Sequence, residues 1–329
     1  MHKTAEKVKH LFVKRPSLLI TDEAYQLASL RHAPEMADVI WEVKRALQQG
    51  ILPEASPHGA CGTYFLKDCE SRPIAVFKRD HYIREVAAYR LDHDRFAGVP
   101  PTVVTTLEHS LWGGKATGSC QYFVPDTVTV VEVKTVDLDK FFPSCVRRIA
   151  SLDIRLMNED RHTSNMLVSS CRKQLIPIDH GFILAQDLSD IHFDWLPWEQ
   201  AMTPFSEREL SYLALLDPER DRKLLIEELG VEERRANRFF VATVFLQLGA
   251  LRQLTAASLG NFLSRRRLGL LRKDAAPSYF ECLIEKLKER NPPNWTIFSR
   301  IVYEEVQRTL DDYEKTTPER SYKEADCRI

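Results

Sequence analysis

The chain has 329 residues, and its 46 Lys and Arg against 47 Asp and Glu give a formal net charge of -1. This balance argues against a protein that binds nucleic acid or an anionic membrane over its whole surface, although it allows a local basic patch. With 44% hydrophobic residues, the composition is that of an ordinary globular protein, and the length predicts about two lobes.

The cysteines and the apolar runs indicate in which cellular compartment the protein resides. None of the seven cysteines belongs to a CxxC pair, and the longest apolar run, FFVATVFLQLGAL, is shorter than the ~20 residues that span a bilayer. The first residues, MHKTAEKVKH, are not followed by the apolar stretch of a secretory signal. We therefore expect reduced thiols, a cytoplasmic location with at most peripheral membrane contact, and no nucleic-acid partner.

Up to about residue 205, short β-rich runs alternate with helices. An amphipathic helix is predicted at residues 35–49, ended by Gly50. Alternating apolar residues then predict a hairpin with a polar turn. The other elements expected in this half are a helix at 83–92, strands at 102–106 and 120–124, and a second strand pair on either side of residues 171–173.

After Pro204 the sequence becomes helical. Ser206 is typical of a helix N-cap, and Asp217 followed by Pro218 is typical of an N-cap and first helical position. Further helices are expected at 232–254, 277–290 and 295–313. The pattern predicts an α+β protein with a helical extension at 1–50, a β-rich lobe at 51–125, and a mainly helical lobe formed by 126–229 and 230–329.

The stretch NEDRHTSNMLV, residues 158–168, carries the most informative spacing. Asp160 and Asn165 are five residues apart, and Asp179 follows 14 residues after Asn165 in the string IPIDHG. Phosphoryl transfer needs a carboxylate beside the attacking hydroxyl and oxygen ligands for Mg²⁺. Kinase-like folds supply them from a loop with Asp and Asn at this spacing, and from an Asp at the end of the next hairpin.

The order Asp-Arg-His in this loop resembles the D-R-H-x-x-N loop of the phosphatidylinositol 3-/4-kinase superfamily. The flanking strings REVAAYRLDH, GVPPTVV, LDIRLMNEDRHTSN, IPIDHGF and FDWLPWEQA resemble its type II gamma phosphatidylinositol 4-kinases, from about residue 43 to 229. The resemblance implies a bilobal, protein-kinase-like fold that uses ATP and Mg²⁺.

The resemblance also implies roles for the loop residues. Asp160 would accept or orient the hydroxyl proton, while Asn165 and Asp179 would hold Mg²⁺. Arg161 and His162 belong to the catalytic loop and shape it; for His162, proton transfer and simple packing are equally open. Asp153, ahead of the loop, is expected to order it by hydrogen bonding.

Nucleotide-binding residues are expected in the β-rich lobe. The segment HGACGT would cover the phosphates with backbone N–H groups, through Gly59, Gly62 and Thr63. Lys78 would bind the α- and β-phosphates, held in place by Glu85. Cys61 stands where the resembled family usually has a further glycine.

The acceptor is left open between a protein and a lipid. The activation segment, residues 180–207, contains no Lys or Arg, and it carries Asp187, Asp190, Asp194 and Glu199. An acidic segment repels a phosphoinositide and favours Ser or Thr in a basic protein. Phosphatidylinositol, phosphorylated on its 4-hydroxyl, is the acceptor that the family name implies. The alternative is a catalytically inactive kinase-like scaffold, which the intact set of polar positions argues against.

Overall fold

The computed structural model describes residues 29–56, 62–133, 141–169, 174–184, 187–188, 191–265 and 276–316. Contacts divide the chain into two compact units. The first comprises residues 1–80 and 101–122, and the second comprises 81–100 and 123–329. These bounds differ from the expected ones: residues 81–100 join the second unit, and the helix predicted as part of a separate extension belongs to the first.

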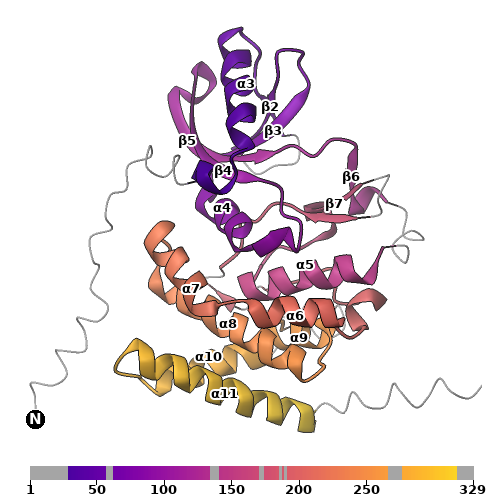
Figure 1. Ribbon diagram of the computed structural model, residues 1–329, viewed down its shortest axis with the longest axis vertical. Coiled ribbons are helices and arrows are strands. Elements are labelled where there is room, and N and C mark those ends of the chain that lie inside the picture. Colours follow the sequence, from indigo (N-terminus) through magenta and orange to yellow (C-terminus); the bar gives the residue numbers. More distant parts are fainter. Residues whose placement is uncertain are drawn as a thin grey trace, which may run out of the picture. The chain divides into compact units, whose positions relative to one another are not determined.

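The first unit contains an antiparallel sheet with the strand order β1-β2-β3-β5-β4 (Figure 1). Its strands are β1 (Glu54–Ala55), β2 (Thr63–Lys67), β3 (Pro73–Lys78), β4 (Thr102–His109) and β5 (Gly114–Tyr122). The predicted β2–β3 hairpin is confirmed. Strand β5 begins earlier than expected, because Gly113 and Gly114 adopt positive φ values that turn the chain back at once.

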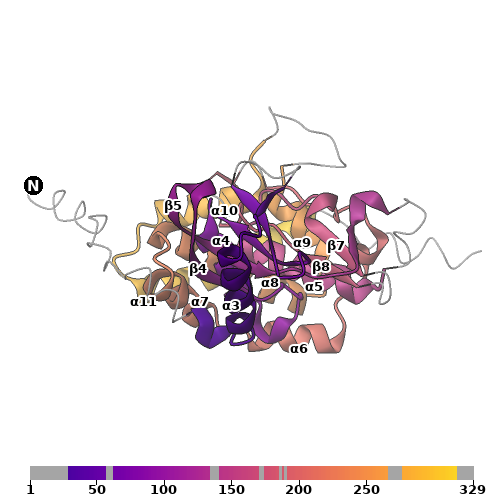
Figure 2. The same ribbon diagram turned by 90° about the horizontal axis from the view of Figure 1, so that it is seen from above.

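Helix α3 (Met36–Gln48) confirms the predicted amphipathic helix. Its buried residues are Met36, Ile40, Val43 and Ala46, and their spacing of three and four forms one apolar stripe. The helix contacts β2, β3, β4 and β5, and it lies beside β4 in the view from above (Figure 2). This packing explains why the helix belongs to the sheet's unit.

The second unit is mainly helical. Its α-helices are α4 (Tyr82–Leu91), α5 (Pro143–Leu156), α6 (Glu207–Leu215), α7 (Pro218–Lys223), α8 (Glu233–Leu251), α9 (Ala256–Leu263), α10 (Tyr279–Glu289) and α11 (Trp295–Thr316). Helix α7 continues into a π-helical turn, Leu224–Glu228. A small antiparallel sheet consists of β6 (Thr127–Thr129), β7 (Met166–Ser169) and β8 (Leu175–Pro177).

Helix α8 forms the core of this unit and contacts α5, α6, α7, α9 and α11. Figure 1 shows it between α5 and the α10–α11 pair. Most of its side chains are buried all round, as expected for the apolar run noted in the sequence. The predicted caps are confirmed: Ser206 forms a capping box with Glu209, and the Asp217 carboxylate accepts hydrogen bonds from two backbone N–H groups.

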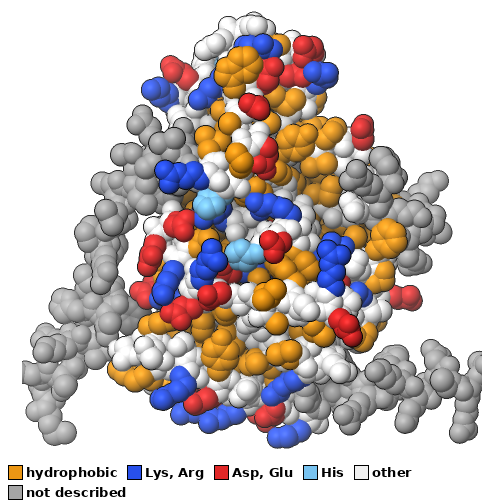
Figure 3. Space-filling view, in the orientation of Figure 1, with side chains coloured by type: hydrophobic (Ala, Val, Ile, Leu, Met, Phe, Trp, Pro, Cys, Tyr) orange, Lys and Arg blue, Asp and Glu red, His pale blue; other side chains and the backbone are white. Residues whose placement is uncertain are grey.

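Surface charge in the structure is mixed. On the face shown in Figure 3, basic and acidic side chains are interspersed with hydrophobic ones. In the described part of the chain, no helix combines the length and apolar character needed to cross a membrane. The mixed surface agrees with the near-zero net charge in the sequence.

The structure predicts contrasting reactivity for two thiols. Burial raises the pKa of Cys120 on β5 to about 12, whereas Cys282 on α10 is exposed. Because the thiolate is the reactive form, an alkylating reagent at pH 8 should label Cys282 in the native protein and Cys120 only after denaturation. Peptide mass spectrometry measures both sites, and equal labelling rates in the native protein would contradict the fold.

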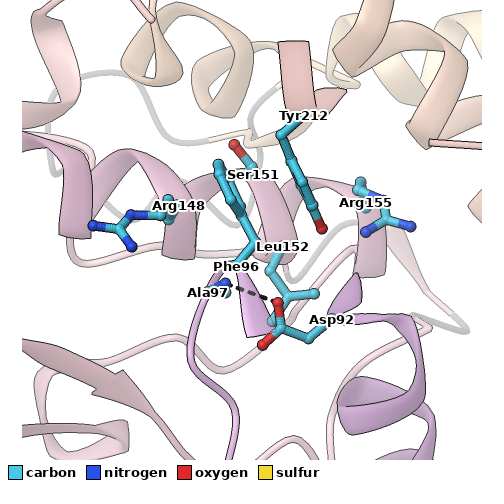
Figure 4. A pocket seen from close by; sticks show the side chains of 8 residues that line it. All are labelled: Asp92, Phe96, Ala97, Arg148, Ser151, Leu152, Arg155 and Tyr212. Carbon is cyan, nitrogen blue, oxygen red and sulfur yellow. Dashed lines mark hydrogen bonds between the residues drawn. The ribbon is translucent and has the colours of Figure 1, made fainter. Parts of the chain in front are cut away.

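The Asp92 carboxylate, at the end of α4, holds the backbone of the segment that follows. It accepts backbone hydrogen bonds from Ala97 at 2.8 Å and from Gly98 and Val99 at 2.9 Å. It lines a small pocket (Figure 4), together with Phe96, Ala97, Arg148, Ser151, Leu152, Arg155 and Tyr212. The Tyr212 ring stacks on Phe96 with centroids 3.6 Å apart, so the pocket is a junction between α4, α5 and α6.

Removal of this carboxylate should destabilise the fold. We expect Asp92→Ala to lower the free energy of unfolding by about 3 kcal/mol, since it leaves buried N–H groups without an acceptor. Urea denaturation measures the difference. Asp94→Asn, at an exposed position two residues away, is the matched control; equal losses in the two variants would contradict the role of Asp92.

Candidate active site

The predicted catalytic loop follows α5 directly. Met157 ends the helix with a left-handed backbone (φ 48°), and the loop closes with a 3-10 turn, Thr163–Asn165. The Asp160 and His162 side chains are 38% and 41% exposed. Their closest atoms, Asp160 Oδ1 and His162 Nε2, are 3.3 Å apart. Both groups can therefore be reached by a substrate.

Asn165 joins these two residues. Its Nδ2 donates to the Asp160 carbonyl at 2.9 Å and to Asp160 Oδ2 at 3.3 Å, and lies 3.2 Å from His162 Nε2. Asp160, His162 and Asn165 thus form one cluster, as their predicted common role requires. Since Nδ2 makes these contacts, the amide oxygen is the atom that can bind a cation, and Mg²⁺ prefers oxygen ligands.

Asp179 comes directly after a residue that is bonded to the loop. The Ile178 N–H donates to the Asn165 carbonyl at 3.0 Å. Asp179 itself has a φ of 54°, which is uncommon for a residue with a side chain and is found at functional sites where the surroundings impose it. The Asp179 carboxylate and the Asn165 amide oxygen suit Mg²⁺, which typically takes one or two protein ligands together with substrate phosphates.

Arg161 is placed differently from its two neighbours. Its side chain is fully buried, and its Nε donates to both Asp153 oxygens at 3.0 Å. Its Nη1 donates to the Ile178 carbonyl at 2.8 Å. Because a buried guanidinium cannot touch a substrate, Arg161 can act only by ordering the loop, which is the shaping role expected for it. Asp153 bonds to the loop as expected.

Glu85, on α4, contacts the segment after Asp179. It is 2% exposed, and its Oε1 accepts a hydrogen bond from the His180 backbone N–H at 3.1 Å. His180 Nδ1 lies 3.8 Å from Glu85 Oε2, and burial lowers the pKa of His180, which keeps the imidazole neutral. The expected pairing of Glu85 with Lys78 stays a prediction.

The predicted phosphate-binding residues lie at one end of the β2–β3 hairpin. Thr63 is paired with Lys78 in the strand ladder. Gly62 has a φ of 116°, and a Cβ there would lie 3.0 Å from Asp80 Oδ2, so the position requires glycine. Gly59 and Cys61 lie outside the described residues. The hairpin thus brings Gly62, Thr63 and Lys78 together.

One acidic residue of the activation segment, Asp194, is hydrogen-bonded to the catalytic loop. This contact was not predicted from the sequence. Asp194 Oδ2 accepts a hydrogen bond from the Thr163 N–H at 2.8 Å, and Oδ1 lies 2.6 Å from His192 Nε2. Partial burial raises the pKa of Asp194, but the two hydrogen bonds together with the charges of His192 and His162 lower the pKa overall. Asp194 is therefore ionised and part of the loop's support. Asp190 lies outside the described residues.

Two arginines from other helices contact the same segment. Arg84 Nη1, from α4, donates to the Gly181 carbonyl at 2.8 Å, and Arg235 Nη1, from α8, donates to the Leu184 carbonyl at 3.1 Å. Burial and the neighbouring Arg235 lower the pKa of Arg84. A charge count within the activation segment could not reveal these two arginines, because Arg84 lies 97 positions and Arg235 lies 51 positions from the residue that each contacts.

Comparison with known proteins defines the class. Residues 68–256, more than half of the chain, match the family model described as phosphatidylinositol 3- and 4-kinase. The chain therefore belongs to this family of kinases. The α+β fold, an antiparallel sheet followed by a mainly helical part, is that of a kinase-like protein, as the sequence predicted.

Individual relatives narrow the resemblance to one subgroup. The chain is similar to phosphatidylinositol 4-kinase gamma 5 of Arabidopsis thaliana, with 33% identity over 278 residues, 68% of this chain and 44% of the relative. For gamma 1 of the same plant the values are 32% over 284 residues, 71% and 51%, and for gamma 6 they are 30% over 329 residues, 81% and 52%. The chain thus spans about half the length of these curated relatives.

Proposed function

We propose that this protein transfers the γ-phosphoryl group of ATP to a hydroxyl group. The observation that carries the proposal is the cluster of Asp160, His162 and Asn165, whose backbone is bonded to the residue preceding Asp179. Membership of the phosphatidylinositol 3- and 4-kinase family supports the use of ATP. An inactive scaffold would not need this geometry.

Each residue has a role in the proposed reaction. The exposed Asp160 carboxylate orients the acceptor hydroxyl and takes its proton, while Asn165 Nδ2 holds one of its oxygens in place. The Asn165 amide oxygen and Asp179 hold Mg²⁺, which when bound neutralises charge on the phosphates. Lys78, with Gly62 and Thr63 beside it, binds the nucleotide phosphates. Catalysis then rests on positioning and charge neutralisation.

We propose a protein acceptor, with Ser or Thr in a basic sequence. Asp194 is ionised, partly exposed and bonded to the catalytic loop, so a fixed negative charge lies beside the reacting residues. Asp187 and Glu199 are exposed on the same segment. Arg84 and Arg235 each use an N–H group on a main-chain carbonyl there, so that donor is not available to an anionic headgroup.

The second candidate acceptor is the inositol 4-hydroxyl of phosphatidylinositol. The names of the relatives support it, since each is called a phosphatidylinositol 4-kinase. Phosphatidylinositol carries a single phosphodiester charge, so the acidic segment repels it less than it repels a polyphosphoinositide.

Transfer of label from ATP tests the acceptor class. Three acceptors are supplied in parallel with Mg²⁺: phosphatidylinositol vesicles, a Ser/Thr peptide flanked by Arg, and the same peptide flanked by Glu. Asp179→Ala provides the blank. We expect label mainly in the basic peptide. Label in the vesicles and in neither peptide would overturn the protein acceptor and support the lipid.

A charge reversal on the activation segment sharpens this test. Glu199→Lys should raise KM for the basic peptide about three- to tenfold, because it replaces an attraction by a repulsion near the acceptor. Glu304→Lys makes the same charge change at an exposed position of α11 and is the matched control. An equal KM in the two variants would contradict acceptor recognition by the acidic segment.

A further inference from the structure

A fully buried carboxylate lies behind the catalytic loop. Asp153, on α5, is 0% exposed. Besides Arg161, it accepts hydrogen bonds from Asn158 Nδ2 on Oδ1 and from Trp195 Nε1 on Oδ2, both at 3.0 Å. One carboxylate therefore binds the start of the catalytic loop, its arginine, and a tryptophan of the activation segment.

The loop residues that bond to Asp153 also bond to backbone groups at or beside the proposed reacting residues. Asn158 Oδ1 accepts a hydrogen bond from the Asp160 N–H at 3.0 Å. Arg161 Nη1 donates to the carbonyls of Asn165 and Ile178. The backbone at or next to the proposed base and both proposed metal ligands is thus held, directly or through one residue, by this carboxylate.

Trp195 connects the activation segment to the same point. Its side chain is 0% exposed and stacks on Phe193, with centroids 4.8 Å apart and planes 14° from parallel. Gly260 of α9 also packs closely here: a Cβ at that position would come within 2.6 Å of Leu196 Cδ2 and 2.7 Å of the Trp195 indole. The indole is therefore tightly packed, and its N–H donates to Asp153.

The main chain beside Trp195 is joined to the loop as well. Phe193 and Arg161 form an isolated parallel β-bridge, and the Asp194 N–H donates to the Arg161 carbonyl at 2.9 Å. With the Asp194–Thr163 hydrogen bond, these contacts make residues 193–195 and the catalytic loop one structural element.

We propose that Trp195 is a positioning residue for the acceptor. Its indole N–H ties the segment that receives the acceptor to the carboxylate that orients Asp160, so the bond sets the register between acceptor hydroxyl and base. This inference rests on the proposed phosphoryl transfer. Loss of the Trp195 bond leaves the hydrogen bonds of Asp153 to Arg161 and Asn158, which hold the proposed metal ligands, so it affects the acceptor rather than ATP.

Trp195→Phe isolates the hydrogen bond. This substitution keeps an aromatic ring packed at this position, and it leaves Asp153 hydrogen-bonded to Arg161 and Asn158. Asp153→Asn is less suitable, because it leaves the buried Arg161 guanidinium without its counterion and endangers folding. Trp198→Phe is the matched control: Trp198 lies three residues along the same segment and packs near Phe141 instead. Gly260→Ala is a second probe, since its methyl group would meet both the indole and the Leu196 side chain.

Steady-state kinetics on the full chain, with ATP and a basic Ser/Thr peptide varied separately, test the proposal. Misplacing reacting groups by about 1 Å can cost 10²-fold in rate, so we expect Trp195→Phe to lower kcat/KM for the peptide by about 10²-fold and Gly260→Ala to lower it as well. The KM for ATP should stay within about twofold, and Trp198→Phe should change neither quantity. An unchanged kcat/KM for the peptide in Trp195→Phe, or a loss of the same size in Trp198→Phe, would overturn the proposal.

A second readout does not depend on activity. Trp195→Phe should speed hydrogen exchange at the amides of Thr163 and Asp194 relative to Trp198→Phe, because both amides bridge the loop and the segment. If the wild-type protein transfers no phosphate, the proposed function fails, but the exchange rates still test whether Trp195 joins the activation segment to the catalytic loop. Unchanged exchange at both amides would overturn this role of Trp195.

Discussion

Asp179→Ala is expected to lower phosphoryl transfer by at least about 10³-fold, because a bound metal ion supplies several kcal/mol of charge stabilisation in the transition state and each ~1.4 kcal/mol is a factor of ten. The variant loses the only carboxylate that we assign to Mg²⁺. The left-handed backbone at this position is accessible to Ala at moderate cost, so the protein should still fold.

The rate of label transfer at saturating ATP measures this effect. Glu304→Ala removes an exposed carboxylate from α11, outside the proposed site, and serves as the control, with a rate close to that of the wild type. Partial rescue of Asp179→Ala by higher Mg²⁺ would agree with the assignment. Transfer by Asp179→Ala at more than a tenth of the wild-type rate would contradict it.

Asp160→Asn should lower kcat by about 10²- to 10⁴-fold, the usual contribution of a general base. The amide keeps the size of the carboxylate and can still accept the hydrogen bond from Asn165 Nδ2, so the loop should retain its shape. Binding of ATP, measured by calorimetry, should change little, because Asp160 faces the acceptor. A variant that turns over at the wild-type rate would show that Asp160 is not the base.

These two variants also separate an enzyme from a scaffold. A scaffold that binds ATP would give the same binding curve in the wild type and in Asp160→Asn, with no turnover in either. An enzyme gives equal binding and a large difference in turnover. The distinction therefore depends on kcat and not on nucleotide affinity.

Local signals in the sequence predicted much of the fold. Helix α6 begins after Ser206 and α7 after Asp217, because an N-cap depends on hydrogen bonds within one turn. The stripe of α3 and the β2–β3 hairpin follow from periodicity in the same way. Helix α9 was not predicted, since its short apolar run, AASLGNFL, has no polar face to show a helical period.

The candidate site was predictable only in part. The spacing of Asp160, Asn165 and Asp179 predicted the candidate site, because a motif of this kind is local, and the structure bonds Asn165 to Asp160 and to the residue before Asp179. The support around them is not local: Trp195 reaches Asp153 across 42 residues, and Arg84 reaches Gly181 across 97. Such contacts depend on tertiary packing, which periodicity and spacing do not encode.

The same dependence on tertiary packing explains why the sequence alone did not show which charges surround the activation segment. In the sequence, Asp194 is one of the acidic charges of the activation segment, whereas in the structure it is bonded to Thr163 and His192. Contacts of Arg84 and Arg235 with that segment are likewise invisible in the sequence. Net charge along a stretch of chain therefore describes its neighbourhood poorly wherever distant helices supply counter-charges.

Phosphoryl transfer itself is tested by supplying ATP labelled in its γ-phosphate together with basic peptide and phosphatidylinositol vesicles. The wild type with Mg²⁺ is compared with the wild type in EDTA and with Asp179→Ala. We expect label in an acceptor for the wild type with Mg²⁺ and background in the other two. Background in all three, while the wild type binds ATP, would contradict a phosphotransferase and favour a kinase-like binding module.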